Sequence, residues 1–400
     1  MRTTNTDEIY YDPYDVEIFK DPYPMFRRLR EEAPLYYNER YDFFAVSRFD
    51  DVERGLTDRD TFISSRGAVL EMIKNGTPIP PGIFIFEDPP QHTMHRGLLS
   101  RVFTPKKMNA LEPLIRQFCE EALDPLVGRD RIDFVEDLGA RMPMRVIGML
   151  LGIPEADQQA IRQRGDTSLR TEPGRPKDYR SSMMASGSEA FAEYLDWRMK
   201  HPSDDLMTQL LRAEFEDETG TVRTLTREEV LLFVTVLATA GNETTNRLIG
   251  WTGKVLSDHS GQRRELVANP SLIPNAIEEI LRFEPPANKV ARYVNRDITL
   301  HGKTVPKGSA MIFLIGAANR DERRFPDPER FDIHRAIDHH LSFGYGAHFC
   351  LGAALARLEG CVALEELLKR FPNWEVDLDN AKLASTSTVR GWETLPAFIR

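Results

Sequence analysis

The chain has 400 residues, of which 41% are hydrophobic and 28% are charged, a composition typical of globular proteins with a large core. Its formal net charge of -10 argues against nucleic-acid binding, which normally requires a basic face. Three cysteines, odd in number and widely spread, do not suit a disulfide framework.

The sequence contains no repeat and no linker rich in glycine or serine, so we expect one domain over residues 1–400. The most apolar run starts at Leu231 and meets Asn242 and Glu243 well before the ~20 residues that a membrane span needs. The N-terminus carries acids and tyrosines where a signal peptide would be basic and then apolar. We therefore expect a cytoplasmic protein without a membrane anchor.

Apolar residues recur at helical spacing in three segments, and strand signals are short and few. Helices are predicted over 24–34, 108–123 and 191–200, and strands within 42–49 and 292–316. The predicted fold class is mainly α with small β-sheets.

The segment from Asp88, DPPQHTMHRGLLSRVF, predicts a helix that begins after two prolines. On such a helix His92 and Arg96 lie one turn apart on one face. The two side chains are suited to binding a carboxylate, since arginine offers a fork of donors and histidine adds one more. The alternative is a solvated basic face.

The longest predicted helix begins at Thr226, whose hydroxyl forms a capping box with Glu229. It is apolar on nearly every face up to Ala240, so it must run through the interior. If it continues to about Ser257, it is ~45 Å long.

The middle of this helix reads AGNETTN, residues 240–246. Gly241 weakens the helix, and the Thr244 hydroxyl is placed to donate to the carbonyl of Ala240. A buried carboxylate at Glu243 beside this hydroxyl is suited to relaying protons. The alternative is a polar stripe where the helix reaches the surface.

The motif EEILRFEPP from Glu278 places Glu279 and Arg282 three residues apart on a helix that stops at Pro285. The segment FPDPERF adds Arg330, which we expect to join them in a buried charged network. Taken alone, such a pair is more often a surface ion pair of little energetic value.

The stretch SFGYGAHFCLG, residues 342–352, places Cys350 among glycines and aromatic residues. A dinucleotide fingerprint fails because Phe349 stands where a glycine is required, and a phosphate loop at 302–304 fails at Asp297. Zinc remains open, with His339, His340 and His348 nearby, although paired ligand spacing is missing.

A haem fits this stretch better. The amphipathic segment after Cys350 predicts a helix whose N-terminus stabilises a thiolate. Gly344, Gly346 and Gly352 allow the backbone to approach a flat ligand closely and to direct N–H groups at the sulfur.

These motifs together resemble the cytochrome P450s, and specifically the soluble bacterial haem-thiolate monooxygenases. The resemblance implies a single-domain cytochrome P450 fold built around the long central helix and the cysteine-ligand loop. It implies haem b with Cys350 as the axial iron ligand. The expected haem contacts are His92, Arg96, Ala240, Gly241, Arg292, His340, Phe343, Gly344, His348, Cys350 and Gly352, with His92, Arg96, Arg292 and His340 donating to the propionates. The implied catalytic pair is Glu243 and Thr244, and the structural network is Glu279, Arg282 and Arg330.

The resemblance also implies O2-dependent hydroxylation, or another oxidation, of a small lipophilic substrate such as a terpenoid, fatty acid or steroid-like molecule. Electrons would come from NAD(P)H through a ferredoxin reductase and a ferredoxin, and the protein would be a monomer. A basic cluster of Arg101, Lys106, Lys107 and Arg357 would meet the acidic carrier. A peroxide-driven peroxygenase and a haem-binding sensor or carrier are the alternatives.

The segments that line the substrate pocket in this family fall here on five stretches, which contain mostly apolar and adaptable side chains. They are 64–86, about 165–191 with Met183 and Met184, the middle of the long helix, 286–291 and 388–392.

Overall fold

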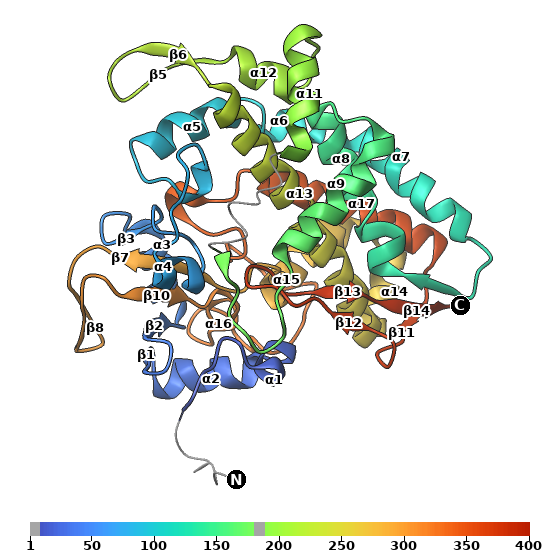
Figure 1. Cartoon of the computed structure of the whole chain (residues 1–400). Coiled ribbons are helices and arrows are strands. Elements are labelled where there is room, and N and C mark those ends of the chain that lie inside the picture. Colours follow the sequence, from blue (N-terminus) through green and yellow to red (C-terminus); the bar gives the residue numbers. More distant parts are fainter. Residues whose placement is uncertain (1–8, 180–188) are drawn as a thin grey trace.

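In the computed structural model, which describes residues 9–179 and 189–400, helix α13 (Arg227–Asp258) crosses the middle of the molecule (Figure 1). The predicted capping box is confirmed: the Thr226 hydroxyl accepts from the backbone N–H of Glu229 at 3.2 Å, and the Glu229 carboxylate accepts from the Thr226 N–H at 2.7 Å. The helix is unbroken through 240–246. At 1.5 Å per residue it is about 48 Å long.

The helices around α13 form the larger part of the molecule and share its apolar core. Two of the three predicted helices are confirmed, as α2 and α11, whereas the segment 108–123 divides between α6 and α7. The helical bounds are α1 Val16–Lys20, α2 Tyr23–Glu32, α3 Phe49–Thr57, α4 Leu70–Asn75, α5 Gln91–Ser100, α6 Pro105–Asn109, α7 Glu112–Leu123, α8 Met142–Leu151, α9 Glu155–Leu169, α11 Glu189–Lys200, α12 Leu206–Arg212, α14 Ser260–Ala268, α15 Ile273–Phe283, α16 Ile315–Ala318 and α17 Ala353–Arg370.

A five-stranded sheet in the order β1-β2-β10-β7-β3 lies beside the helical part (Figure 1). Strand β10 pairs in parallel with β2, and the other neighbours are antiparallel. Smaller sheets are β11-β14-β4, β12-β13, β5-β6 and β8-β9. The strand bounds are β1 Leu35–Asn38, β2 Phe43–Val46, β3 Phe62–Ile63, β4 Arg131–Asp133, β5 Glu214–Glu216, β6 Val222–Thr224, β7 Val290–Val294, β8 Ile298–Leu300, β9 Lys303–Val305, β10 Ala310–Phe313, β11 Trp374–Val376, β12 Lys382–Leu383, β13 Trp392–Thr394 and β14 Pro396–Ile399.

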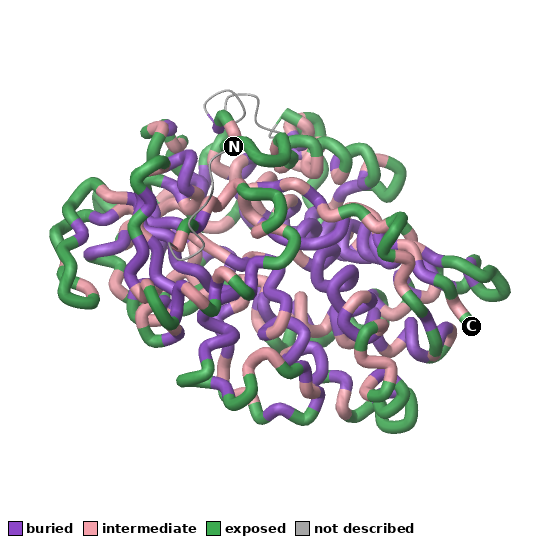
Figure 2. Tube along the Cα trace, turned by 90° about the horizontal axis from the view of Figure 1, so that it is seen from below, coloured by how far each residue is buried: buried purple, intermediate pink, exposed green. Residues whose placement is uncertain are grey.

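Alternation along the strands gives this sheet two apolar faces, because successive side chains point to opposite sides. In β7, Ala291 belongs to one buried cluster, while Val290 and Val294 pack against the other. Buried residues are therefore concentrated in α13 with its neighbours and in the sheet, and exposed residues lie mostly at the periphery (Figure 2).

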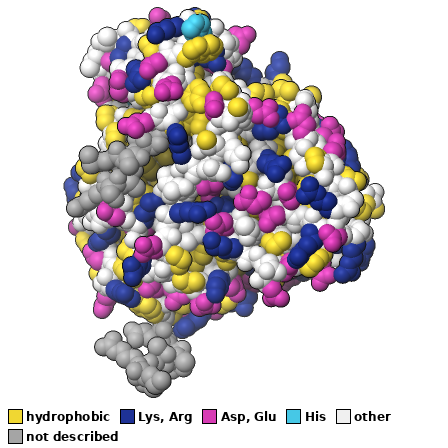
Figure 3. All heavy atoms as spheres, turned by 45° about the vertical axis from the view of Figure 1, so that its right-hand side comes forward, with side chains coloured by type: hydrophobic (Ala, Val, Ile, Leu, Met, Phe, Trp, Pro, Cys, Tyr) yellow, Lys and Arg dark blue, Asp and Glu magenta, His cyan; other side chains and the backbone are white. Residues whose placement is uncertain are grey.

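The surface is mixed in charge. On the face shown in Figure 3, acidic and basic side chains are interspersed. None of the helices in the described ranges combines the length and apolarity needed to cross a bilayer.

Candidate haem site

The loop before Cys350 has a backbone that favours glycine. Gly344 and Gly346 have φ angles of 69° and 70°, in the left-handed region that side chains with a Cβ rarely adopt. A Cβ at Gly346 would also lie 3.0 Å from the carbonyl oxygen of Leu56. The loop closes through a hydrogen bond of 2.8 Å from the Cys350 N–H to the Phe343 carbonyl. Cys350 is thereby held just before α17, whose N-cap is Gly352.

The Cys350 thiol faces an internal cavity of about 350 Å³. The residue is exposed, yet protein surrounds it, so its accessible surface lies within this cavity. Burial raises the pKa of the Cys350 thiol, whereas a hydrogen bond from the Gly352 N–H and the charges of Arg96 and Arg357 favour the thiolate. We call this space the Cys350 cavity.

One side of the Cys350 cavity carries basic groups from three elements: His92 and Arg96 on α5, Arg292 on β7, and His348 in the loop. The His92 and His348 rings lie 4.1 Å apart. Burial and then the charge of Arg96 lower the pKa of His92 to about 4. Burial and then the charge of Arg292 lower the pKa of His348 to about 3. Both imidazoles are therefore neutral at physiological pH, while the arginines remain charged.

These groups are available to a ligand. His92 is 2% exposed, and among residues 9–179 and 189–400 its Nε2 has no hydrogen-bond partner, which is costly unless a ligand supplies one. Within the same ranges the Arg292 guanidinium donates only to the carbonyl of the adjacent Ala291, at 2.9 Å. A thiol on one wall and clustered cationic or neutral donors at the side fit a haem, which has an iron to be ligated and carboxylates to be bound.

The structure does not place His340 among these donors. His340 does not line the Cys350 cavity; its Nε2 lies 3.3 Å from Oε2 of Glu278. Although burial raises the pKa of Glu278, bonds from His340 and Arg357 outweigh it and lower that pKa to about 2. The short turn at 346–348 holds His348, two residues before Cys350, over the cavity instead.

The zinc alternative gains no support. Within the ranges that the structure describes, no group of three His, Cys, Asp or Glu side chains is arranged to hold a metal ion. His339 bonds to Glu53 at 2.6 Å, and His348 contacts the Ser64 hydroxyl at 3.1 Å. Two of the potential zinc ligands, His339 and His348, therefore contact separate partners.

Helix α13 places Thr244 on the wall of the Cys350 cavity, together with Ala240 and Gly241. The predicted bond is confirmed: the Thr244 hydroxyl donates to the Ala240 carbonyl at 2.8 Å. The adjacent Thr245 donates to Oε2 of Glu359 at 3.1 Å. Glu359 also lines this cavity, and nothing in the sequence spacing around it indicated this.

Glu243 lies on another side of α13 and does not line the Cys350 cavity. It is 3% exposed and accepts from Arg247 Nε at 3.0 Å. Asp166 on α9 lies beside it. Burial is the main cause, and the charge of the nearby Glu243 the second, that raises the pKa of Asp166 to about 6. The two carboxyl groups link α9 to α13, a contact that no spacing in the sequence indicates.

The pair of Glu279 and Arg282 is fully buried and bidentate, with N–O distances of 2.7 and 2.8 Å. The third partner is Arg335, whose Nε donates to Glu279 at 3.1 Å. Arg330 was the wrong choice: its side chain is 68% exposed and pairs with Asp332. Its backbone carbonyl instead accepts from Arg335 Nη2 at 2.8 Å.

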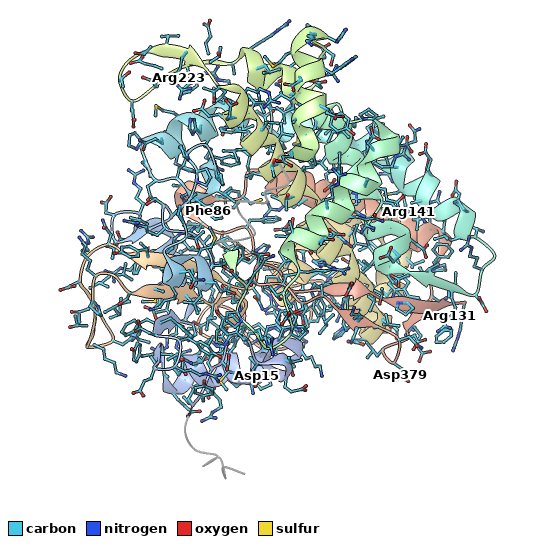
Figure 4. The ribbon with its side chains drawn as sticks, in the orientation of Figure 1. Asp15, Phe86, Arg131, Arg141, Arg223 and Asp379 are labelled. Atoms are coloured by element: carbon cyan, nitrogen blue, oxygen red, sulfur yellow. The ribbon has the colours of Figure 1, made fainter. Side chains whose placement is uncertain are left out.

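The rest of the Cys350 cavity is apolar, with Phe86 on its wall; Figure 4 places Phe86 below α5, toward the centre of the molecule. Two predicted stretches, 64–86 and 286–291, contribute to the lining, as does the middle of α13. The described residues of 165–191 and the 388–392 turn do not. Met183 and Met184 lie outside the described residues.

Comparisons with known proteins agree with this geometry. The family model for Cytochrome P450 matches residues 252–391. The chain is 38% identical over 398 residues to putative cytochrome P450 123 of Mycobacterium tuberculosis, covering 98% of both chains. It superimposes with a TM-score of 0.85 on CYP109Q5 from Chondromyces apiculatus, at 35% identity over 97% of this chain and 98% of that one. CYP109E1 from Bacillus megaterium in complex with testosterone also gives a TM-score of 0.85, at 31% identity over 96% and 99% of the two chains. The similarity thus extends over essentially the whole chain.

Proposed function

This chain belongs to the cytochrome P450 family and is an oxidoreductase of the monooxygenase class, and from that premise we propose that it hydroxylates a small lipophilic molecule with electrons delivered by a ferredoxin. The observation that carries the proposal is the Cys350 thiol facing a largely apolar cavity that has a group of basic side chains on one side. The family implies a haem and a redox partner.

In this proposal Cys350 ligates the haem iron, and His92, Arg96, Arg292 and His348 bind the haem carboxylates. When bound, a haem with a thiolate ligand supplies O2 activation by favouring O–O cleavage. The chain contributes the ligand, a closed apolar site and a proton supply.

The proton supply is assigned to α13. Thr244 presents a hydroxyl to the Cys350 cavity, held by its bond to Ala240. Glu243 and Asp166 lie behind it, and Asp166, with a pKa of about 6, exchanges protons readily near neutral pH. Protons would pass from Asp166 through Glu243 toward the Thr244 side of the helix.

A lipophilic substrate is supported by the wall of the Cys350 cavity, where Phe84, Phe86, Val236 and Leu237 gather. The similar CYP109E1 has been crystallised with testosterone, which is consistent with a rigid, apolar molecule of that class. The substrate class remains part of this proposal.

The ferredoxin would dock near α6, where Lys106 and Lys107 are exposed, as is Arg101 just before them. Arg357 is removed from the expected basic cluster, because its guanidinium is bidentate to Glu278 at 2.7 and 3.0 Å and stacks 4.5 Å from the Phe343 ring. Electrons would originate from NAD(P)H, and the protein would act as a monomer.

The experiment is an optical spectrum of the purified protein, reduced and exposed to carbon monoxide. We expect the strongly red-shifted Soret band of thiolate ligation, and its loss in Cys350→Ala. Cys361→Ala is the matched control, since Cys361 is partly buried on α17 and away from the Cys350 cavity. Haem binding without that band, or a band that persists in Cys350→Ala, would contradict the proposal.

A further inference from the structure

A second cavity of about 330 Å³ adjoins the Cys350 cavity. Its walls come from α1, α4, the start of β7, and the segments 171–175 and 381–387; Asp15, labelled in Figure 4, caps α1 at this part of the molecule. Ala68 and Val290 line both cavities. The backbone holds these shared residues in place, because the Ala291 N–H donates to the Ala68 carbonyl at 2.8 Å. The two cavities therefore meet at Ala68 and Val290.

Strand alternation assigns neighbouring residues of β7 to different cavities. Lys289 and Ala291 line the second cavity, whereas Arg292 lines the Cys350 cavity. At 3.3 Å per residue, the Cα atoms of Lys289 and Arg292 are about 10 Å apart along the strand. A single elongated molecule can therefore have its head beside Lys289 and its body in the Cys350 cavity. We call the second space the Lys289 cavity.

Lys289 is an incompletely paired cation. Its Nζ donates to the Pro13 carbonyl at 3.2 Å, and it forms no ion pair with any residue in the described ranges. An ammonium has three donors, so two remain for a ligand. Burial lowers the pKa of Lys289, while Glu71 and Asp12 act in the opposite direction. Lys289 is half-buried by its accessible surface, and an anion at Nζ would offset the cost of leaving its charge without a counter-ion there.

The other cations on the wall already have acidic partners. Lys20 pairs with Glu17 at 2.8 Å, Arg175 with Glu172 at 3.0 Å, and Lys382 with Glu393 at 2.8 Å. The buried Glu71 has its own donor, the Ser387 hydroxyl, at 2.8 Å. Lys289 is therefore the basic residue on this wall whose acidic partner would have to come from a ligand.

Tyr14 adds a neutral donor to the Lys289 cavity. Burial first, and the charge of Glu71 next, raise the pKa of its phenol, so the hydroxyl stays protonated. Glu71 also restricts the charge of the ligand, because its carboxylate repels a doubly charged phosphate more strongly than a singly charged carboxylate.

We propose that the Lys289 cavity binds the carboxylate of an amphipathic substrate whose apolar part extends past Ala68 and Val290 into the Cys350 cavity. This inference rests on the proposed monooxygenase function and narrows its substrates to lipophilic carboxylic acids. Lys289 is then a residue that determines specificity, reached by the substrate but distant from the reacting carbon.

The test compares dodecanoate with 1-dodecanol, which share a chain and differ in charge. Equilibrium binding to the haem-loaded protein is followed by the spin-state shift of its spectrum and by calorimetry. We expect wild type to prefer dodecanoate and Lys289→Met to weaken dodecanoate roughly tenfold or more, with 1-dodecanol unchanged. Methionine keeps the length of the side chain and removes the charge.

Lys382→Met is the matched control, since Lys382 lines the same cavity but pairs with Glu393; it should leave both affinities unchanged. Equal losses of dodecanoate and 1-dodecanol in Lys289→Met, no preference for dodecanoate in wild type, or no dodecanoate binding would overturn the inference. Testosterone distinguishes failure of the Lys289 assignment from failure of the proposed function. If testosterone binds while dodecanoate does not, the monooxygenase proposal stands and the Lys289 assignment falls. Absence of the thiolate spectrum would instead remove the proposed function.

Discussion

Burial acts in the same direction on Cys350 and Glu359, two acids on the wall of one cavity, but their neighbours differ. Cys350 receives the Gly352 N–H and the charges of two arginines, which favour its anion. Glu359 has only the Thr245 hydroxyl to offset burial, and its pKa is raised to about 8. At neutral pH the carboxyl of Glu359 is therefore largely protonated in the folded protein and ionised in the unfolded one.

We predict that Glu359→Gln stabilises the protein in a pH-dependent way. The ordinary pKa of Glu359 is 4.5 and its folded pKa is about 8, so between these values the folded state binds more protons. The stability that protonation contributes is complete below about 4.5 and is lost as pH rises through 8. Glutamine is never ionised, so the melting temperature of the variant should exceed that of wild type by on the order of 2 °C or more at pH 8.5 and by much less at pH 5.

Thermal unfolding of the haem-loaded protein, followed by circular dichroism at both pH values, measures this difference. Glu375→Gln serves as a control, because Glu375 is 70% exposed. A melting-temperature change in Glu359→Gln that is the same at pH 5 and pH 8.5 would show that Glu359 does not titrate differently on folding.

Single residues show how far the sequence could specify the site. Cys350, Thr244 and His92 line the Cys350 cavity as expected, and each belongs to a motif whose spacing fixes its neighbours. The structure places His340 and Arg330 apart from the expected partners, because each lies in an irregular segment where spacing alone does not tell which side chain points inward.

Three residues, Glu359, Asp166 and Lys289, had no signal in the sequence. Each is a charged residue in a segment that otherwise suits an exposed face or a loop. Its burial results from another element packing over it, α13 on Glu359 and Asp166 and the region of Pro13 on Lys289. Such contacts join positions far apart in the chain, which a local pattern does not encode.

At the scale of elements, the network centred on Glu279 fixes α15 to the loop before Cys350. Arg282 reaches the carbonyl of Asn319 at 2.9 Å, and Asn319 in turn accepts from the Leu341 N–H at 2.8 Å. Arg335 adds bonds to the carbonyls of Pro326 and Asp327, at 2.6 and 3.0 Å. The position of the Cys350 loop thus depends on a buried charged cluster some distance from the cavity.

We predict that Arg335→Ala lowers the free energy of unfolding by about 3 kcal/mol, because it removes one partner of a buried carboxylate and leaves several carbonyls without donors. Arg330→Ala should change it by no more than about 0.5 kcal/mol, since the Arg330 side chain is exposed. Urea unfolding of the two variants beside wild type makes the comparison. Equal destabilisation by both substitutions would return Arg330 to the network.

The predicted elements succeeded where periodicity was long and caps were explicit. Helix α13 begins at Arg227 and ends at Asp258, one residue beyond the predicted end at Ser257. The segment 108–123 divided into α6 and α7 instead, because Pro113 occupies the first turn of α7 and leaves the preceding turn separate. The fold class, mainly α with small sheets, is confirmed.

At the scale of the whole molecule, the net charge of -10 would oppose an acidic carrier such as the proposed ferredoxin, so its docking would depend on local basic residues. We predict that ferredoxin-supported turnover falls roughly threefold or more in Lys106→Glu, and falls in wild type as ionic strength rises. Stopped-flow measurement of the rate of haem reduction across a salt series tests both effects.

Lys303→Glu is the control for this charge reversal, because it changes net charge equally and lies exposed on β9, in a hairpin with β8 that is far from α6 (Figure 1). Matching losses in Lys106→Glu and Lys303→Glu would attribute the effect to total charge. Rates insensitive to salt and to Lys106→Glu would place the carrier elsewhere on the surface.

Because side chains alternate along β7, the register of this strand determines which residues line the Lys289 cavity and which line the Cys350 cavity. Because Lys289 and Arg292 line different cavities, a one-residue shift in the register of β7 and the residue before it would exchange their faces. Substitution at Lys289 would alter one face alone. A shift of one residue in the strand would alter ligand choice and haem retention together.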